Sequence, residues 1–175
     1  MAGTSEILGT YSPENIVIVL SNSKMSHTIS GYADGTFMSI TRQAPHAALY
    51  TGADLSNARV VRGNKGATVT LTLHQAGESN DVLSALLAAD ELSRDGSDCF
   101  SITIKDTIGR SMYYSPVAFL GNNPDASFGV DIETRDWQIH CVSLTQNTAG
   151  NGKVTPDGVE TLQALDVEVD ARWRV

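Results

Sequence analysis

The amino-acid sequence predicts a mainly β fold in which one α-helix packs on a sheet of antiparallel strands. Residues 67–74 alternate strictly between apolar and polar side chains and are rich in β-branched residues, which is the pattern of a half-buried strand. Apolar residues then repeat on one helical face (Val82, Leu83, Leu86 and Leu87). Thr, Ser, Gly and Val are plentiful in the rest of the chain, as they are in β-rich proteins.

The helix is predicted near residues 80–94. A turn at Gln75–Glu78 stops the preceding strand, and Ser79 or Asn80 then offers a side-chain oxygen to the free amides of the first helical turn. We expect the helix to end between Ser93 and Gly96, where Gly96 suits a left-handed cap.

Size and charge exclude several classes of protein. The chain has 175 residues (18.7 kDa), which is the size of one domain and enough to bury roughly 70% of the surface of the unfolded chain. A net charge of −8 disfavours a module that binds nucleic acid through phosphate contacts. The longest apolar run, Ile16–Leu20, is too short for a membrane span or a signal peptide, so we expect folding in the cytosol.

The two cysteines, Cys99 and Cys141, are too few for a disulfide framework and lack the neighbours of a zinc site. The favoured interpretation is that both are small buried hydrophobes with free thiols. A disulfide, within or between subunits, stays open as the second interpretation.

The N-terminal part of the chain begins with an irregular arm, residues 1–14. Ile16–Leu20 is apolar throughout and predicts a strand covered on both faces. Residues 21–27 turn the chain back, and glycines in 31–36 suit a bend ahead of a strand at 37–41.

Residues 42–66 form the least regular part, which we interpret as a long, exposed hairpin or loop. A connection of this length in a compact domain is usually functional. It is also locally basic within an acidic chain, with Arg42, Arg59, Arg62 and Lys65 against Asp54. These four basic residues are candidates for docking between subunits, because a basic arm fits the acidic body of a neighbour. The alternative is a solvated loop.

Four further strands are predicted after the helix. Residues 99–105 pair with 111–115, where Pro116 breaks the alternation and 117–120 continue past a bulge. Two strands follow, one at 126–133 and one at 136–144. In the second, Asp136, Gln138 and His140 share one face, so that Cys141 lies on the apolar face with Trp137 and Ile139.

The C-terminal part consists of a polar connection, residues 146–158, and a regular terminal segment. Leu165–Val175 alternates between apolar and charged residues, which predicts a long strand with Trp173 on its apolar face. This strand adds to the edge of its own sheet or to that of a neighbouring subunit, and both interpretations stay open. In the second interpretation Trp173 is a fifth candidate for docking between subunits. We therefore expect a β domain at 1–145 and an extension at 146–175.

Taken together, several blocks resemble the tail tube proteins of contractile-tailed bacteriophages. The resemblance covers about residues 11–144, and residues 146–175 lie beyond the shared pattern. It rests on these blocks in this order: YSPENIVIVL, GYADGTFMSITR, GNKGATVTLTL, SNDVLSALLAADE, SITIKD and RDWQIHC.

The resemblance implies a β-sandwich or barrel flanked by one helix, in a structural protein of the virion. It implies six copies in a ring and rings stacked into a hollow tube, with a contractile sheath outside. Baseplate and tail terminator proteins are the implied partners at the ends, and assembly takes place in the host cytoplasm without a membrane anchor. DNA passes through the lumen without specific binding, and no cofactor is implied.

An acidic lumen repels DNA phosphates, and each subunit already carries a net charge of −8. Asp131, Glu133 and Asp136 are candidates for the lumen lining. The alternative is that they belong to a solvated strand face.

Three other functions are alternatives to the tail tube. A tube protein of a related contractile injection or secretion system uses the same fold. A monomeric carbohydrate- or receptor-binding sandwich is disfavoured, since no cluster of aromatic residues stands out. An enzyme is disfavoured because the sequence has no GxSxG, HExxH, P-loop or dinucleotide-binding motif and its four histidines are scattered, so we expect neither catalysis nor a metal.

Overall fold

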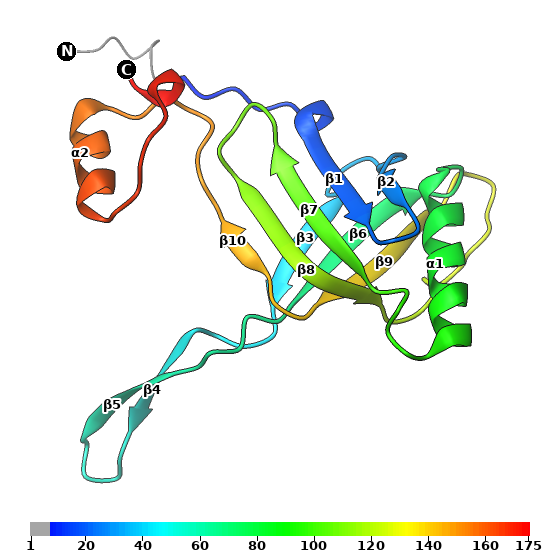
Figure 1. The fold of residues 1–175 in the computed structure, drawn as a ribbon, viewed down its shortest axis with the longest axis horizontal. Coiled ribbons are helices and arrows are strands. Elements are labelled where there is room, and N and C mark those ends of the chain that lie inside the picture. Colours follow the sequence, from blue (N-terminus) through cyan, green and yellow to red (C-terminus); the bar gives the residue numbers. More distant parts are fainter. Residues whose placement is uncertain (1–7) are drawn as a thin grey trace. The chain divides into compact units, whose positions relative to one another are not determined.

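Residues 8–175 are the part of the chain that the computed structural model describes, and they are mainly β (Figure 1). Residues 1–7 of the predicted N-terminal arm lie outside this part. The strands are β1 (Ile16–Ser21), β2 (Ser26–Thr28), β3 (Met38–Arg42), β4 (Ala47–Thr51), β5 (Asn57–Val61), β6 (Ala67–His74), β7 (Phe100–Asp106), β8 (Met112–Leu120), β9 (Thr134–Cys141) and β10 (Thr145–Asn147). The helices are α1 (Ser79–Ser93) and α2 (Pro156–Ala164), with 3-10 turns at Pro13–Asn15 and Ala171–Trp173.

Eight strands form one antiparallel sheet, in the order β2-β1-β7-β8-β9-β6-β3, with β10 also pairing with β8. Among the described residues, β4 and β5 pair with each other and with no other strand, as a separate hairpin. The predicted mainly β, antiparallel fold is therefore confirmed. None of the helices in residues 8–175 is long and apolar enough to cross a membrane.

Contacts divide the described chain into two compact units. The sheet unit comprises residues 18–103 and 113–145, and the terminal unit comprises residues 8–17, 104–112 and 146–175. Most of the fully buried side chains belong to the sheet unit, and they include Ile18, Leu20, Val69, Leu71, Leu73, Leu83, Ile102 and Ile139.

The strand β6 occupies the position predicted for residues 67–74 and lies between β3 and β9. Its apolar residues are completely buried and its polar residues are half-buried, as the alternation predicts. Val69 faces Ile40 of β3 on one side and Ile139 of β9 on the other, so that three strands contribute to one apolar layer.

The helix α1 is confirmed, but the prediction for its N-cap is wrong. Glu78 occupies the cap position, and no side chain caps the first turn. The Ser79 hydroxyl is buried and accepts a hydrogen bond from the Ser30 amide at 2.9 Å. The Asn80 Nδ2 donates to the His74 carbonyl, and its Oδ1 accepts from the Trp137 indole at 2.9 Å. Both side chains hold the helix on the sheet, which a reading of local sequence does not anticipate.

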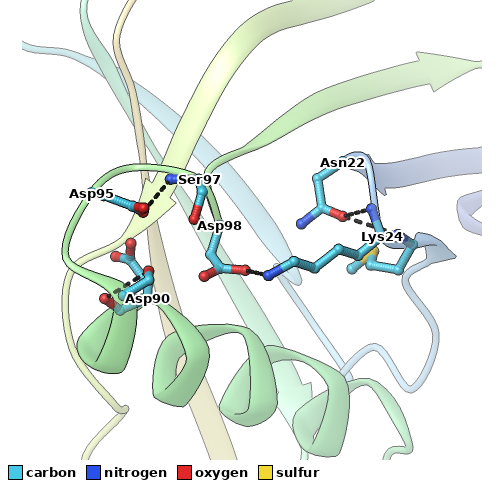
Figure 2. Close-up of polar contacts among 8 residues, drawn as sticks. Asn22, Lys24, Asp90, Asp95, Ser97 and Asp98 are labelled. Carbon is cyan, nitrogen blue, oxygen red and sulfur yellow. Dashed lines mark hydrogen bonds and ion pairs between the residues drawn. The ribbon is translucent and has the colours of Figure 1, made fainter.

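The C-terminal end of α1 is fixed by an ion pair that the sequence did not predict (Figure 2). Arg94 is the C-cap residue and takes the left-handed conformation with φ 53°. Gly96, the predicted cap, lies two residues later and is also left-handed, with φ 78°. Beyond it, the Lys24 ammonium donates to Asp98 Oδ1 at 2.6 Å, and the Asp98 side chain is only 3% exposed. This hydrogen bond lowers the pKa of Asp98 below its usual range.

The strand β8 runs through Pro116, and the predicted continuation over 117–120 is confirmed. Pro116 and Val117 are both exposed, so the alternation slips by one residue at this point. The hydroxyl of the buried residue Ser115 donates to the Val117 carbonyl at 2.8 Å.

The strand predicted at 126–133 is wrong. These residues lie in a loop, and β9 begins only at Thr134. Because β9 pairs with β6 on one side and β8 on the other, the segment before it finds no free strand edge beside β9.

The predicted terminal strand at Leu165–Val175 is also wrong, and α2 was missed. Thr155 caps α2 by accepting from the Gly158 amide at 3.3 Å, with Pro156 in the first turn. Asp166 then adopts a left-handed φ of 59°, and the Asp170 carboxylate accepts from the Arg172 amide to cap a 3-10 turn. Two local aspartate turns therefore replace the extended strand.

Candidate functional site

The hairpin β4–β5 extends away from the sheet of its own unit (Figure 1), and this confirms the long exposed hairpin predicted within 42–66. All five residues of β5 are exposed. Large apolar side chains are nonetheless placed here: Leu49 is 76% exposed, Tyr50 61% and Leu55 80%. A free surface of this kind marks a site of contact with another molecule.

Both faces of the hairpin carry apolar side chains. Residues directly opposite each other in an antiparallel pair share a face. Leu49 and its partner Arg59 lie on one face together with Val61, and Val60 and Tyr50 lie on the other. An isolated two-stranded hairpin is marginally stable in water. With apolar residues on both faces, this one suits burial between other surfaces.

The turn of the hairpin is built around Asp54. Its carboxylate accepts from the Ser56 hydroxyl at 2.6 Å and from the Ser56 amide at 3.1 Å, and these bonds lower the pKa of Asp54. Leu55 beside it has φ 64°, a left-handed conformation that disfavours a branched apolar residue. The turn thus holds a strained leucine out in solvent.

The base of the hairpin is a recess of about 370 Å³ with mixed apolar and basic walls. Three of the predicted docking residues line it, together with Pro45, His46 and Val61: they are Arg42, Arg62 and Lys65. Arg59, the fourth, lies further along β5. The structure therefore places the four predicted basic residues on the hairpin and at its base, although their role in docking stays a prediction.

Trp173, the fifth predicted docking residue, belongs to the terminal unit instead. The Arg110 guanidinium lies 5.0 Å from the centroid of its indole ring, and that of Arg172 lies at 5.6 Å. Arg110 also donates to the Gly152 carbonyl at 2.6 Å. Trp173 is thus held by cations of its own unit.

The open face of strands β3, β6 and β9 is rich in hydroxyl and amide groups. Register places Thr70 between Ser39 and Gln138, and Thr68 between Thr41 and His140. The two basic residues of these strands, Arg42 and Arg135, alternate onto the opposite side. A sheet face without Lys or Arg is one to which DNA phosphates have little attraction.

The three predicted lumen acids occupy two different places. Asp136 lies on this open face of β9, where its carboxylate accepts from the Thr72 hydroxyl at 2.7 Å. Asp131 and Glu133 lie in the loop that precedes β9. Whether they line a lumen stays a prediction.

Both cysteines have free thiols. Cys141 is buried as predicted, and burial raises the pKa of its thiol. Cys99 is partly buried, unlike the prediction for it, and this partial burial raises the pKa of its thiol as well. Within residues 8–175, no cluster of His, Cys, Asp and Glu is arranged to hold a metal ion.

Comparison with known proteins found no matching family model. Over 175 residues and 99% of both chains, the sequence is 38% identical to "Structural protein ORF10" of Pseudomonas phage KPP10. Among solved structures, the fold is similar to the anti-feeding prophage cap (AFP tube terminating cap), with a TM-score of 0.50 and 13% identity over 85% of this chain and all of the other. It is also similar to the PVC sheath/tube terminator of an extracellular contractile injection system in the extended state, with a TM-score of 0.49 and 10% identity over 79% and 97% of the two chains.

Proposed function

We propose that this chain builds the inner tube of a contractile tail. The premise is that it belongs to the family of phage structural proteins that includes ORF10 of Pseudomonas phage KPP10. In this proposal the subunits form rings of six, and the rings stack into a hollow conduit through which DNA leaves the virion. The chain acts as a structural protein and not as an enzyme. Its partners are other copies of itself, a surrounding sheath, and the baseplate and terminator proteins at the two ends.

The β4–β5 hairpin is the observation that carries this proposal. It exposes Leu49, Tyr50 and Leu55 on an arm that pairs with no other strand within residues 8–175. In a stack of identical subunits, such an arm reaches a neighbouring copy and buries both of its faces there. Contacts that repeat head to tail without closing produce a filament.

The open face of β3, β6 and β9 supports the second half of the proposal. A channel for DNA needs a wall that does not retain phosphates, since each Lys or Arg contact adds affinity. This face offers Thr, Ser and Gln side chains, the imidazoles of His74 and His140, and a single carboxylate, Asp136. We propose that it faces the lumen, so that DNA slides along a weakly acidic, hydroxyl-rich wall.

A cap that ends the tube is the second candidate function. It is favoured by the fold shared with the AFP tube terminating cap. The two candidates differ in one property: a tube subunit stacks without limit, whereas a cap forms one ring and presents one docking face.

The experiment is electron microscopy of the purified chain at rising protein concentration, in low and high salt. Hollow tubes of many stacked rings are expected. Single rings that add only to the end of preformed tubes would instead support the cap, and particles that stay monomeric in every condition, with and without baseplate, would contradict both.

A further inference from the structure

We propose that the β4–β5 hairpin of one copy docks on residues 125–133 of a second copy. We call these residues, DASFGVDIE, the acidic segment. The inference rests on the proposed function, since it names the surface that receives the hairpin in the stack.

The acidic segment exposes three large apolar side chains in a row of alternate positions. Phe128 is 79% exposed, Ile132 is 63% exposed and Val130 between them is fully exposed. Such a concentration of free apolar surface is unusual in a chain that functions alone. The alternation is that of a strand, although the segment has no strand partner in its own unit.

This segment is nevertheless held in a defined place. Arg135 donates to the Ser127 carbonyl at 3.2 Å, and its guanidinium lies 5.1 Å from the Phe128 ring centroid. At the other end, the Gln75 amide donates to the Glu133 carbonyl at 2.9 Å. The apolar side chains are therefore presented outward from a fixed backbone, which suits a preformed docking surface.

The charges of the two surfaces are opposite. The acidic segment carries Asp125, Asp131 and Glu133 and no basic residue. The hairpin and its base (residues 42–65) carry four basic residues and the single acid Asp54. Within residues 8–175, neither Asp131 nor Arg59 forms an ion pair, so both charges are available to another molecule.

The two surfaces lie at opposite ends of the same strand. Lys65, at the base of the hairpin, precedes β6 by two residues, and Gln75, which bonds to Glu133, follows it directly. The eight residues of β6 span about 24 Å. In the structure the hairpin extends away from the sheet of its own unit (Figure 1), so it does not lie on its own acidic segment. A second copy placed end to end brings hairpin and acidic segment together, and each added copy repeats the contact.

The occupant to which this argument commits is a second copy of the chain. The apolar hairpin residues match the apolar row of the acidic segment, and the opposite charges fix its orientation. A contact of this kind is heterologous, so that it gives the stack a direction.

Charge reversal tests the pairing directly. One variant carries Arg59→Glu and Arg62→Glu, and the other carries Asp125→Lys and Asp131→Lys. Each variant alone is expected to need at least on the order of tenfold more protein to assemble, because like charges then face each other. An equimolar mixture is expected to assemble at the wild-type concentration, since each reversed surface meets its complement on the other variant. Glu91→Lys with Glu160→Lys, two exposed acids outside both surfaces, is the control matched in net charge to the Asp125→Lys and Asp131→Lys variant.

The outcomes separate the inference from the proposed function. The acidic segment is overturned as the receiving surface if either variant assembles at the wild-type concentration, or if the mixture fails to restore assembly. Tubes of the unmodified chain would still support the proposed function in that case. An unmodified chain that forms no tube with or without baseplate overturns both. Thermal melting of each variant shows that it is folded. Val130→Ser, at a fully exposed position, is a second test that changes no charge, and assembly is again expected to weaken.

Discussion

Leu55 in the hairpin turn offers the sharpest test of whether this arm exists for assembly. It combines a left-handed φ of 64° with a side chain that is 80% exposed. A leucine in this conformation costs about 1–2 kcal/mol that glycine does not. In the free subunit, Leu55→Gly should therefore leave the melting temperature unchanged or raise it.

Assembly should respond in the opposite direction. Full burial of a leucine side chain is worth about 1.5–3 kcal/mol, so burial of the exposed four fifths is worth about 1.2–2.4 kcal/mol. One such contact is lost for each copy that joins. Since 1.4 kcal/mol corresponds to a factor of ten, Leu55→Gly should raise the protein concentration needed for assembly by roughly 7- to 50-fold.

Sedimentation of assembled protein across a concentration series measures this threshold, and thermal melting of the unassembled subunit measures stability. Leu55→Asn is a second variant, because asparagine tolerates the left-handed conformation without adding glycine's flexibility. Leu92→Ala, at an 88% exposed position on α1, is the matched control. The reasoning is refuted if Leu55→Gly assembles at the wild-type threshold, or if Leu92→Ala shifts that threshold as far.

Three further predictions concern the fold that supports the site. Trp137→Phe removes the donor to Asn80 and leaves its Oδ1 unpaired, which should cost about 1–3 kcal/mol of unfolding free energy in a denaturant titration; an unchanged midpoint would contradict this role. Because the pKa of Asp98 is lowered in the folded chain, its bond to Lys24 stabilises the fold fully above about pH 4, and this stabilisation is lost as the pH falls further. The melting temperature of Asp98→Asn should therefore fall less on acidification than that of the wild type. Equal acid dependence in the two proteins would exclude the carboxylate as the cause. Deletion of residues 48–57 should leave a folded subunit by circular dichroism and abolish tubes in electron micrographs, whereas tubes of normal length would show that the hairpin is dispensable.

Elements that depend on local pattern were predictable from the sequence. The strand β6 and the helix α1 appear where the alternation of residues 67–74 and the apolar repeat near 82–87 place them. In both cases the pattern of the element and its burial agree. The cap was mispredicted because Ser79 and Asn80 are used by Ser30 and Trp137, which are distant in sequence.

Alternation misled where no strand edge was available. Phe128, Val130 and Ile132 follow the strand pattern, yet β9 already has both of its neighbours. At the C-terminus, Asp166 and Asp170 form local turns that a count of alternating residues does not detect. The helix α2 did carry a usable signal in Thr155, Pro156 and Asp157, which is a capped helix start.

The basic hairpin was predictable because charge and length are visible in the sequence. The receiving surface was not, since it depends on where register places the two ends of β6. Thr68, Thr70 and Thr72 also showed one polar face, but only pairing with β3 and β9 extends it across three strands.

Electron microscopy of the purified chain, concentrated stepwise without any partner, is the measurement that tests the central claim most directly. The account predicts hollow tubes of stacked rings, with density for the β4–β5 hairpin of each subunit buried against the next ring. Tubes in which the hairpin stays in solvent, or rings that do not stack even after baseplate is added in a second step, would contradict it.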